Sequence, residues 1–497
     1  MARRVFPCWD VPGLKAIFNI SINHSKYFIP FSNMPILFTN NYSTDACRTY
    51  FYDTPLISPL NVFIAVLKHN DKFQTRNMSK NDLIWYISQR QMLEYAMNTI
   101  ALDNYFLTTI TNLTDVLPKR NHIFFPNNTI KTMGSIGLMI YSEKDVLYNR
   151  DFDFPGQKVY ISQVISHQMV RQLFTAVVTQ SRWADQWIGE SLSKLYCFAL
   201  LRMIEHMITR DKFQLAVETY LDKFRFRSTT PYDFWITFQR LLDDTQNEKF
   251  KIKEIMDTWL TQRYYPVMQV FHDRENNTMI LNITHSVSMT KSTWIVPITY
   301  ILYHSMGDII SDIWITSSDI VTINLPIEEN INFVIFNIKH NGYFRVNYDY
   351  HSWLSIKNFL NTDGYDKIDV RNRAQLIDDA YYFMTQGYVS STIFWGLANY
   401  LKNDVNYIAW YPMFNILSFM WPVWDHPEAE LMKGHVRQML GGLLEHLGYE
   451  ERDGEDNMQK TLRLLATRWA CKLGDMKCQR VAARKLSRYL SDRNNEK

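Results

Sequence analysis

Residues 167–171 read His167-Gln168-Met169-Val170-Arg171, and Glu190 follows nineteen residues further along the chain. Helical periodicity dominates from about residue 70 to residue 265, so both positions are expected on helices. Residues four apart on a helix project to the same side, which places His167 and Arg171 on one face. A second helix could bring the carboxylate of Glu190 to His167. The pattern therefore predicts a site built from two neighbouring helices.

The spacing is that of the zinc motif H-E-x-x-H, in which two imidazoles bind the metal and the Glu is the general base. In this chain Gln168 stands at the Glu position and Arg171 at the second His position. An amide cannot take a proton from a metal-bound water, and a guanidinium has no lone pair for a metal. His167 and Glu190 alone remain as vestigial ligands. We expect no intact catalytic residue here and no bound cofactor.

Arg171 would place a permanent positive charge where the dication sits in such motifs. Its fork of N–H groups matches the carboxylate of Glu190. We therefore predict an ion pair between Arg171 and Glu190 that replaces the metal and joins the two helices. A separation above ~4 Å between these side chains would contradict it.

The composition is that of an ordinary globular protein. A chain of 497 residues is long enough for about three domains, and 46% of its residues are hydrophobic. The 53 basic residues nearly balance the 50 acidic ones, for a net charge of +3. This balance does not favour a nucleic-acid partner.

Two features of the chain, a closely spaced cysteine pair and several glycosylation sequons, favour an extracellular protein. It shows no run of ~18 apolar residues and no apolar signal segment at its N-terminus, so membrane association would need segments outside this sequence. Five cysteines are too few for a disulfide framework, although Cys471 and Cys478 are close enough in sequence for a local bridge. Glycosylation sequons occur at Asn19, Asn23, Asn41, Asn77, Asn112, Asn127, Asn276 and Asn282.

Hydrophobic periodicity divides the chain into four regions. Residues 1–66 read as strands, residues 67–266 as mostly helical, residues 267–350 as a small β-sandwich, and residues 351–497 as helical again. Within the second region a helix is expected from Trp85 to Leu102. The fold class that follows is a multidomain α+β protein.

Five stretches resemble signatures of the aminopeptidase N type of zinc aminopeptidase, a gluzincin family. They are Arg4–Ala16 (R-x-F-P-C-x-D-x-P-x-x-K-A), Ser32–Pro35 (S-N-M-P), Val178–Glu190, Gly342–Asp349 and Arg373–Ala380. The resemblance runs nearly from end to end, so we identify the chain as a divergent member of this family, truncated at both ends, and expect it to be inactive.

The resemblance implies a domain for each region. Residues 1–66 correspond to the C-terminal part of an N-terminal β-saddle domain, and residues 67–266 to a thermolysin-like α/β peptidase domain with a degenerate zinc motif. Residues 267–350 correspond to the β-sandwich domain, and residues 351–497 to the start of a C-terminal α-helical superhelical domain. It also implies the disulfide between Cys471 and Cys478, which is similar to one in extracellular relatives.

Two further functional positions of the family are altered here. The G-x-M-E-N motif, whose Glu holds the free amine of the peptide, corresponds to a segment with Met133, Gly134 and Ser135 as the vestigial substrate-binding residues. Gly134 has no carboxylate. Several dozen residues after Glu190, which would include the Tyr that stabilises the oxyanion, are missing, and Tyr196 is too close to Glu190 to replace it.

These losses predict a silent family member that binds peptides or extracellular proteins at the cell surface or outside the cell. Two alternatives remain open. One is a zinc aminopeptidase with an unconventional site, which would release N-terminal amino acids using His167, Glu190 and a third ligand such as His122. The other is a partial gene product without function.

Overall fold

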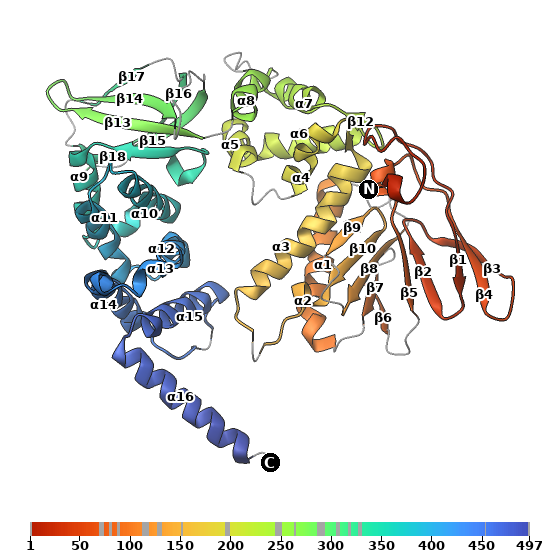
Figure 1. The fold of residues 1–497 in the computed structure, drawn as a ribbon. Helices are drawn as coiled ribbons and strands as arrows, with labels where there is room; N and C mark the ends of the chain where they lie inside the picture. Colours follow the sequence, from red (N-terminus) through yellow and green to blue (C-terminus); the bar gives the residue numbers. More distant parts are fainter. Residues whose placement is uncertain are drawn as a thin grey trace. The chain divides into compact units, whose positions relative to one another are not determined.

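The computed structural model describes residues 2–68, 74–78, 82–86, 90–111, 119–126, 132–150, 153–193, 199–243, 251–262, 265–285, 294–304, 309–316, 320–326, 331–452 and 454–495. These residues form two compact units (Figure 1). Unit 1 comprises Met1–Asp153 and Gln157–Glu254, and unit 2 comprises Phe154–Gly156 and Ile255–Lys497. Both helices and strands are present in each unit, as expected for a multidomain protein of mixed class.

The centre of unit 1 is a five-stranded sheet with the order β6-β7-β8-β10-β9. Its strands are β6 (Gln74–Asn77), β7 (Asp82–Tyr86), β8 (Arg120–Phe125), β9 (Met133–Ser135) and β10 (Leu138–Ser142). The three central strands are parallel, and the two edge strands are antiparallel to their neighbours. Strand β9 is therefore an edge strand.

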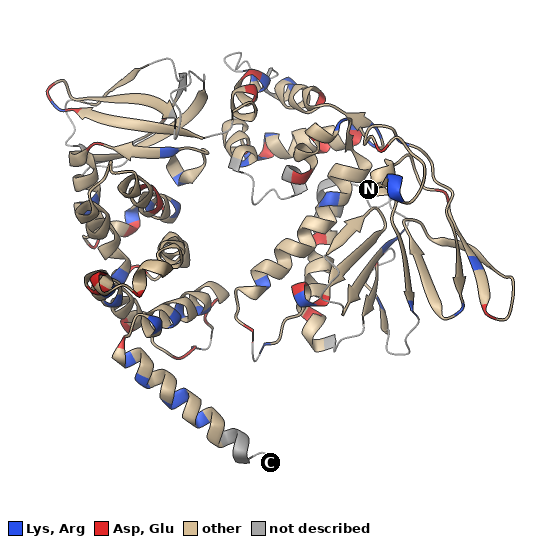
Figure 2. Cartoon of the chain, in the orientation of Figure 1, with Lys and Arg blue, Asp and Glu red and all other residues tan. Residues whose placement is uncertain are grey.

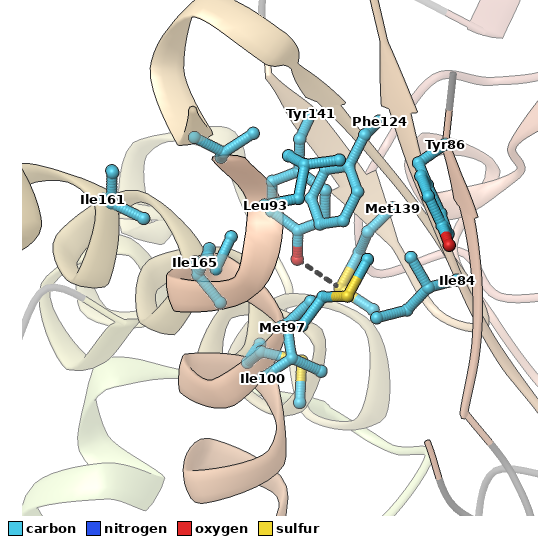
Figure 3. Close-up of a cluster of buried hydrophobic side chains, with 13 residues drawn as sticks. Ile84, Tyr86, Leu93, Met97, Ile100, Phe124, Met139, Tyr141, Ile161 and Ile165 are labelled. Carbon is cyan, nitrogen blue, oxygen red and sulfur yellow. Dashed lines mark hydrogen bonds between the residues drawn. The ribbon is translucent and has the colours of Figure 1, made fainter. Parts of the chain in front are cut away.

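Helices α1 (Arg90–Thr111) and α3 (Gln157–Arg171) pack against this sheet through one apolar cluster (Figure 3). Leu93 and Met97 of α1 and Ile161 and Ile165 of α3 are completely buried in it. The cluster confirms a helix in this part of the sequence but corrects its start. Trp85 belongs to strand β7, and the helix begins at Arg90.

The other face of the sheet is covered by the N-terminal strands. Strands β2 (Phe28–Ser32) and β5 (Ile64–Lys68) form an antiparallel pair. Phe31 of β2 shares a buried cluster with Ile123 and Leu138 of the five-stranded sheet. A second sheet has the order β1-β4-β3, with strands Ser21–Ser25, Ala46–Phe51 and Ile36–Asn41.

The remaining elements of unit 1 follow the sheet in sequence. A π-helical segment, Gln172–Val177, continues directly from α3. The short strand β11 (Thr179–Gln180) pairs with β12 (Ser228–Thr229). The other helices are α2 (Glu143–Val146), α4 (Trp187–Ser193), α5 (Ala199–Ile208), α6 (Arg210–Lys223) and α7 (Pro231–Asp243).

Unit 2 begins with two sheets. One has the order β17-β14-β13-β19 and the other β16-β15-β18. The phenolic oxygen of Tyr348 on β19 accepts a hydrogen bond from the backbone of Phe336 on β18, which joins the two sheets. The strands are β13 (Pro266–Asp273), β14 (Thr278–His285), β15 (Ile295–His304), β16 (Ile309–Thr316), β17 (Val321–Asn324), β18 (Ile331–Phe336) and β19 (Arg345–Tyr348).

The rest of unit 2 is helical. Its helices are α8 (Ile252–Leu260, which spans the boundary of the units), α9 (Tyr350–Leu360), α10 (Val370–Thr385), α11 (Ser391–Ala398), α12 (Tyr407–Phe419), α13 (Trp421–Trp424), α14 (Glu430–Leu447), α15 (Asn457–Lys472) and α16 (Met476–Asn495). Cys471 and Cys478 form a disulfide across the turn between α15 and α16. Gly474 makes this turn with φ +89°, which suits glycine.

The strands of residues 1–66 belong to the same compact unit as the five-stranded sheet. The three boundaries between the predicted domains remain predictions. In the part of the chain that the structure describes, no helix has the length and apolar character needed to span a bilayer.

Candidate functional site

The buried face of α3 determines where the motif residues point. Ile161, Ile165, Gln168 and Met169 recur at helical spacing and are buried toward the sheet. His167 and Arg171 are therefore at the border of this face, and their side chains are 21% and 31% exposed. The motif lies in the last turn of α3, immediately before the π-helical segment. All six residues of that segment are buried.

Helix α4 approaches the π-helical segment very closely, and this approach brings Glu190 to the site. A Cβ atom on Gly189 would lie only 2.2 Å from the carbonyl oxygen of Phe174. A larger residue at 189 would push the two backbones apart. Gly189 therefore allows the neighbouring Glu190 to reach α3.

The predicted ion pair is present. Arg171 Nε donates to Glu190 Oε1 at 2.7 Å, a length typical of a charge-assisted hydrogen bond. The other carboxylate oxygen, Oε2, lies 3.7 Å from His167 Nε2. One carboxylate thus faces both motif side chains of α3.

Arg171 also contacts strand β9. Its Nη1 atom donates to the carbonyl oxygen of Gly134 at 3.2 Å, so one guanidinium joins α3, α4 and the edge strand. Sequence reasoning missed this contact, because the partner is a backbone atom and residue types carry no signal for it.

The vestigial substrate-binding residues Met133, Gly134 and Ser135 form strand β9 itself. A Cβ on Gly134 would lie 2.8 Å from Met139 Cγ and 3.0 Å from Gln168 Oε1, so the glycine leaves room for these two side chains. Met133 is exposed, whereas Ser135 is buried and its hydroxyl donates to the carbonyl of Asn61 at 2.6 Å. The structure thus places β9 beside the motif, as the predicted site requires.

Gln168 occupies the position of the general base and is buried, with 7% exposure. Its Oε1 atom has no hydrogen-bond partner among the described residues. An unpaired buried amide oxygen is costly, by about 1–3 kcal/mol. We have no structural account of why an amide stands here.

The described side chains do not fit a catalytic zinc ion. Such a site needs three protein ligands and an open position for water. His167 and Glu190 supply two donors, and the guanidinium of Arg171 takes the third position. Across the described ranges, no group of three or more His, Cys, Asp or Glu side chains is arranged to hold a metal ion.

His122, the third ligand of the alternative hypothesis, is a fully buried residue of β8. Its Nδ1 atom lies 3.3 Å from the hydroxyl of Tyr141, and its Nε2 atom lies 3.5 Å from Asp82 Oδ1. Burial lowers the pKa of His122, which keeps the imidazole neutral. It belongs to a polar group inside the sheet that also contains Arg120. Tyr196 lies outside the described residues.

One carboxylate near the motif has a perturbed pKa. Asp103 of α1 accepts a hydrogen bond of 2.7 Å from Ser166, the residue before His167. Burial raises the pKa of Asp103 to about 6, and the hydrogen bond from Ser166 partly opposes this rise. Sequence analysis did not select Asp103, because its burial depends on the packing of α1 against α3.

Three family models match the chain in the order of the predicted regions. The Peptidase M1 N-terminal domain matches residues 1–59. The Peptidase family M1 domain matches residues 92–199 and 196–259, and the ERAP1-like C-terminal domain matches residues 333–496. The catalytic-domain model is thus interrupted a few residues after Glu190, where family residues were expected to be missing.

Sequence alignments with glutamyl aminopeptidases extend over almost the entire chain. The human protein is 24% identical over 562 aligned positions, which include 99% of this chain and 57% of the human protein. The bovine protein is 26% identical over 561 positions, and chicken aminopeptidase Ey is 25% identical over 569. The chain therefore spans somewhat more than half the length of these relatives.

The matching domains and their order are those of a metallopeptidase family. The chain belongs to peptidase family M1 and is similar to its aminopeptidases. The human alignment has more positions than this chain has residues, so the relative carries insertions. This fits the interruption of the catalytic-domain match.

Proposed function

We propose that this M1-family chain has lost zinc-dependent peptide hydrolysis and acts as a peptide- or protein-binding ectodomain. The observation that carries the proposal is the 2.7 Å ion pair between Arg171 and Glu190. A guanidinium bonded to the remaining carboxylate ligand repels a dication and occupies the ligand that the dication would need. Zinc binding at His167 would require this pair to break.

The other replacements act in the same direction. Gln168 cannot serve as a general base, and the backbone carbonyl of Gly134 is engaged by Arg171 rather than by a substrate amine. Groups of one catalytic site act together, so losses at several positions do not simply add. A binding function remains compatible with these changes because it needs neither metal nor base.

The cell-surface or extracellular location is part of the same proposal. Five sequon asparagines are exposed and open to glycosylation: Asn19, Asn23, Asn41, Asn77 and Asn276. Asn282 is partly buried on β14, and Asn112 and Asn127 lie outside the described residues. The disulfide between Cys471 and Cys478 also favours an oxidising compartment.

The unconventional aminopeptidase remains the alternative function, and a matched variant separates the two. The chain would be purified, dialysed against zinc and then against buffer, and its metal content measured by atomic spectroscopy. Turnover of amino-acid anilides would be followed in the same preparations. We expect well below one equivalent of zinc and no turnover above the buffer rate.

The matched variant is Q168E/R171H, which restores the base and the second imidazole one turn from His167. We expect this variant to retain about one equivalent of zinc, because three ligands then share one site. Stoichiometric zinc in the unaltered chain, with anilide turnover that a chelator abolishes, would overturn the proposal. Zinc in neither protein would mean that the site geometry itself is lost.

The binding part of the proposal has its own measurement. Short synthetic peptides with a free or acetylated N-terminus would be titrated against the chain by fluorescence polarisation. We expect saturable binding of at least one peptide without cleavage, as monitored by mass spectrometry. Cleaved peptides would support the alternative, and an absence of binding throughout the set would remove the peptide-binding proposal.

A further inference from the structure

A cavity of about 320 Å³ opens in unit 2 between helices α12, α13 and α15. Its volume is in the lower part of the range of small-ligand sites, about 300–1,000 Å³. The cavity belongs to the helical region of unit 2 and shares no residue with the degenerate zinc motif. The cavity is therefore a different site from the one that carries the proposed loss of hydrolysis.

Aromatic rings form much of the cavity wall. Tyr407 and Tyr411 of α12 have ring centroids 5.9 Å apart, and Trp421 of α13 and Trp469 of α15 have centroids 6.2 Å apart. Tyr411 is 52% exposed and Trp421 is 43% exposed, whereas Trp469 is buried. Exposed rings around a cavity offer apolar surface that a flat ligand could cover.

Two cations lie at the same cavity. Arg468 and Lys472 are one turn apart on α15, and both side chains line it. Lys472 Nζ lies 4.2 Å from the ring centroid of Trp421 and 5.3 Å from that of Trp469. The ammonium is thus held against the aromatic wall by cation–π contacts.

These two cations lack the carboxylate partners that other cations of α15 have. On the same helix, Lys460 pairs with Glu451, and Arg463 pairs with Glu455. Within the described part of the chain, no ion pair is formed by Arg468 or Lys472, and no acidic residue lines the cavity. Figure 2 shows basic residues recurring along α15 and α16, which adds to the positive potential.

Neutral polar groups complete the lining. Asn415 and Ser418 of α12 face the cavity. The hydroxyl of Ser418 donates to the carbonyl of Phe414 at 2.8 Å, so its oxygen remains available as an acceptor. Cationic donors, aromatic walls and amide or hydroxyl groups together match an anion carried on a flat apolar body.

We propose that this cavity binds a carboxylate that is joined to an aromatic ring through a short aliphatic chain. The ring stacks against the Tyr and Trp walls, and the carboxylate accepts hydrogen bonds from the guanidinium of Arg468 and the ammonium of Lys472. The carboxylate could belong to a free aromatic acid or to the C-terminal residue of a peptide, since the recognised groups are the same.

The test is a calorimetric titration of the intact chain with two matched probes, 3-phenylpropanoate and its neutral amide, 3-phenylpropanamide. The acid should bind with a dissociation constant on the order of 10⁻⁴ M, typical of a ligand of this size. The amide should bind at least about tenfold more weakly, because it lacks the charge-assisted bonds. Equal binding of acid and amide, or no binding of the acid, overturns the proposal.

Variants locate the binding. R468Q and K472Q should each weaken binding of the acid by about fivefold to tenfold, and W421A should weaken the binding of both probes. K477Q is the matched control, because Lys477 is an exposed lysine of α16 that does not line the cavity. An equal loss in K477Q would show a diffuse charge effect and overturn the site. A thermal melt of each variant confirms that it is folded.

A second pair of probes separates the two sources of the carboxylate. A short peptide ending in phenylalanine is titrated with a free C-terminus and with an amidated one. Tighter binding of the free peptide than of 3-phenylpropanoate assigns the site to peptide C-termini, and the reverse order assigns it to free aromatic acids. Both orders support the proposal only if 3-phenylpropanoate binds more tightly than its amide, and peptide binding that is indifferent to amidation assigns the site to free aromatic acids.

Discussion

The guanidinium of Arg171 connects three elements of the candidate site. It donates to Glu190 on α4 and to the carbonyl of Gly134 on β9, and it is itself part of α3. A metal ion in this position would also join ligands from neighbouring helices. Arg171 therefore places a positive charge between these three elements and holds them together.

The first prediction concerns the strength of this ion pair. In a double-mutant cycle with Arg171→Met and Glu190→Gln, we expect a coupling of about 1 kcal/mol in the free energy of unfolding. The side chains are 31% and 36% exposed, so solvent screening keeps the value small. Urea unfolding measures the coupling, and 1 M salt should reduce it. A coupling near zero would mean that the pair has no role in holding α3 and α4 together.

Helix α3 is the element on which the site depends. Its apolar face packs into the cluster with α1 and the sheet, and Ser166 adds a hydrogen bond to Asp103 of α1. The helix ends in the π-helical segment, which passes close to Gly189 of α4. The positions of His167 and Arg171 thus follow from packing on both sides of α3.

The second prediction concerns the pH dependence of the contact between α1 and α3. Burial raises the pKa of Asp103 from 3.8 to about 6, so the folded state binds more protons than the unfolded state between these values. The wild-type chain therefore loses stability as the pH rises from about 4 through about 6. Asp103→Asn removes the charge and should be more stable than wild type at pH 7.5 by about 2 kcal/mol.

Urea unfolding at pH 4 and pH 7.5 tests this prediction. The gain from Asp103→Asn should be much smaller at pH 4, because the folded carboxyl is then protonated and only about half of the unfolded carboxyls are ionised. Asp222→Asn is the control, because the Asp222 side chain is 83% exposed. The same difference between Asp103→Asn and wild type at both pH values would show that the charge of Asp103 is not involved.

The whole molecule consists of two units that each have their own buried core. Unit 1 is built around the five-stranded sheet, and unit 2 has large buried side chains such as Trp294, Trp353 and Trp410. Buried cores of this kind are what cooperative unfolding requires. The third hypothesis, a partial gene product, predicts instead that no cooperative transition occurs.

The third prediction is that calorimetry will show cooperative unfolding with separable contributions from the two units. Asp103→Asn should raise the contribution of unit 1 at pH 7.5. Asp349→Ala should lower that of unit 2 by about 1 kcal/mol, because Asp349 caps helix α9 by accepting from the backbone of Ser352 at 2.9 Å. A featureless heat-capacity trace would instead support the partial gene product.

Several parts of the fold could be predicted from sequence, for identifiable reasons. The strands of residues 267–350 could be predicted, because segments such as β14, β17 and β18 alternate or consist of apolar β-formers. The predicted helix from Trp85 to Leu102 was wrong at its start. Asp82–Tyr86 is a buried parallel strand, and its apolar residues are also compatible with a turn of helix. Pairing with the neighbouring strand β8 decides between strand and helix here. Local periodicity cannot predict this pairing, because β8 is distant in the sequence.

The sequence alone determined the altered residue types: an amide at 168, a guanidinium at 171 and a glycine at 134. It also determined the family, because its signatures are spread over the whole chain. Only the tertiary structure decided that Arg171 reaches both Glu190 and Gly134, and that Arg468 and Lys472 share an aromatic cavity. The physical reason is that such contacts join residues far apart in the chain, and their distances depend on how helices and strands pack.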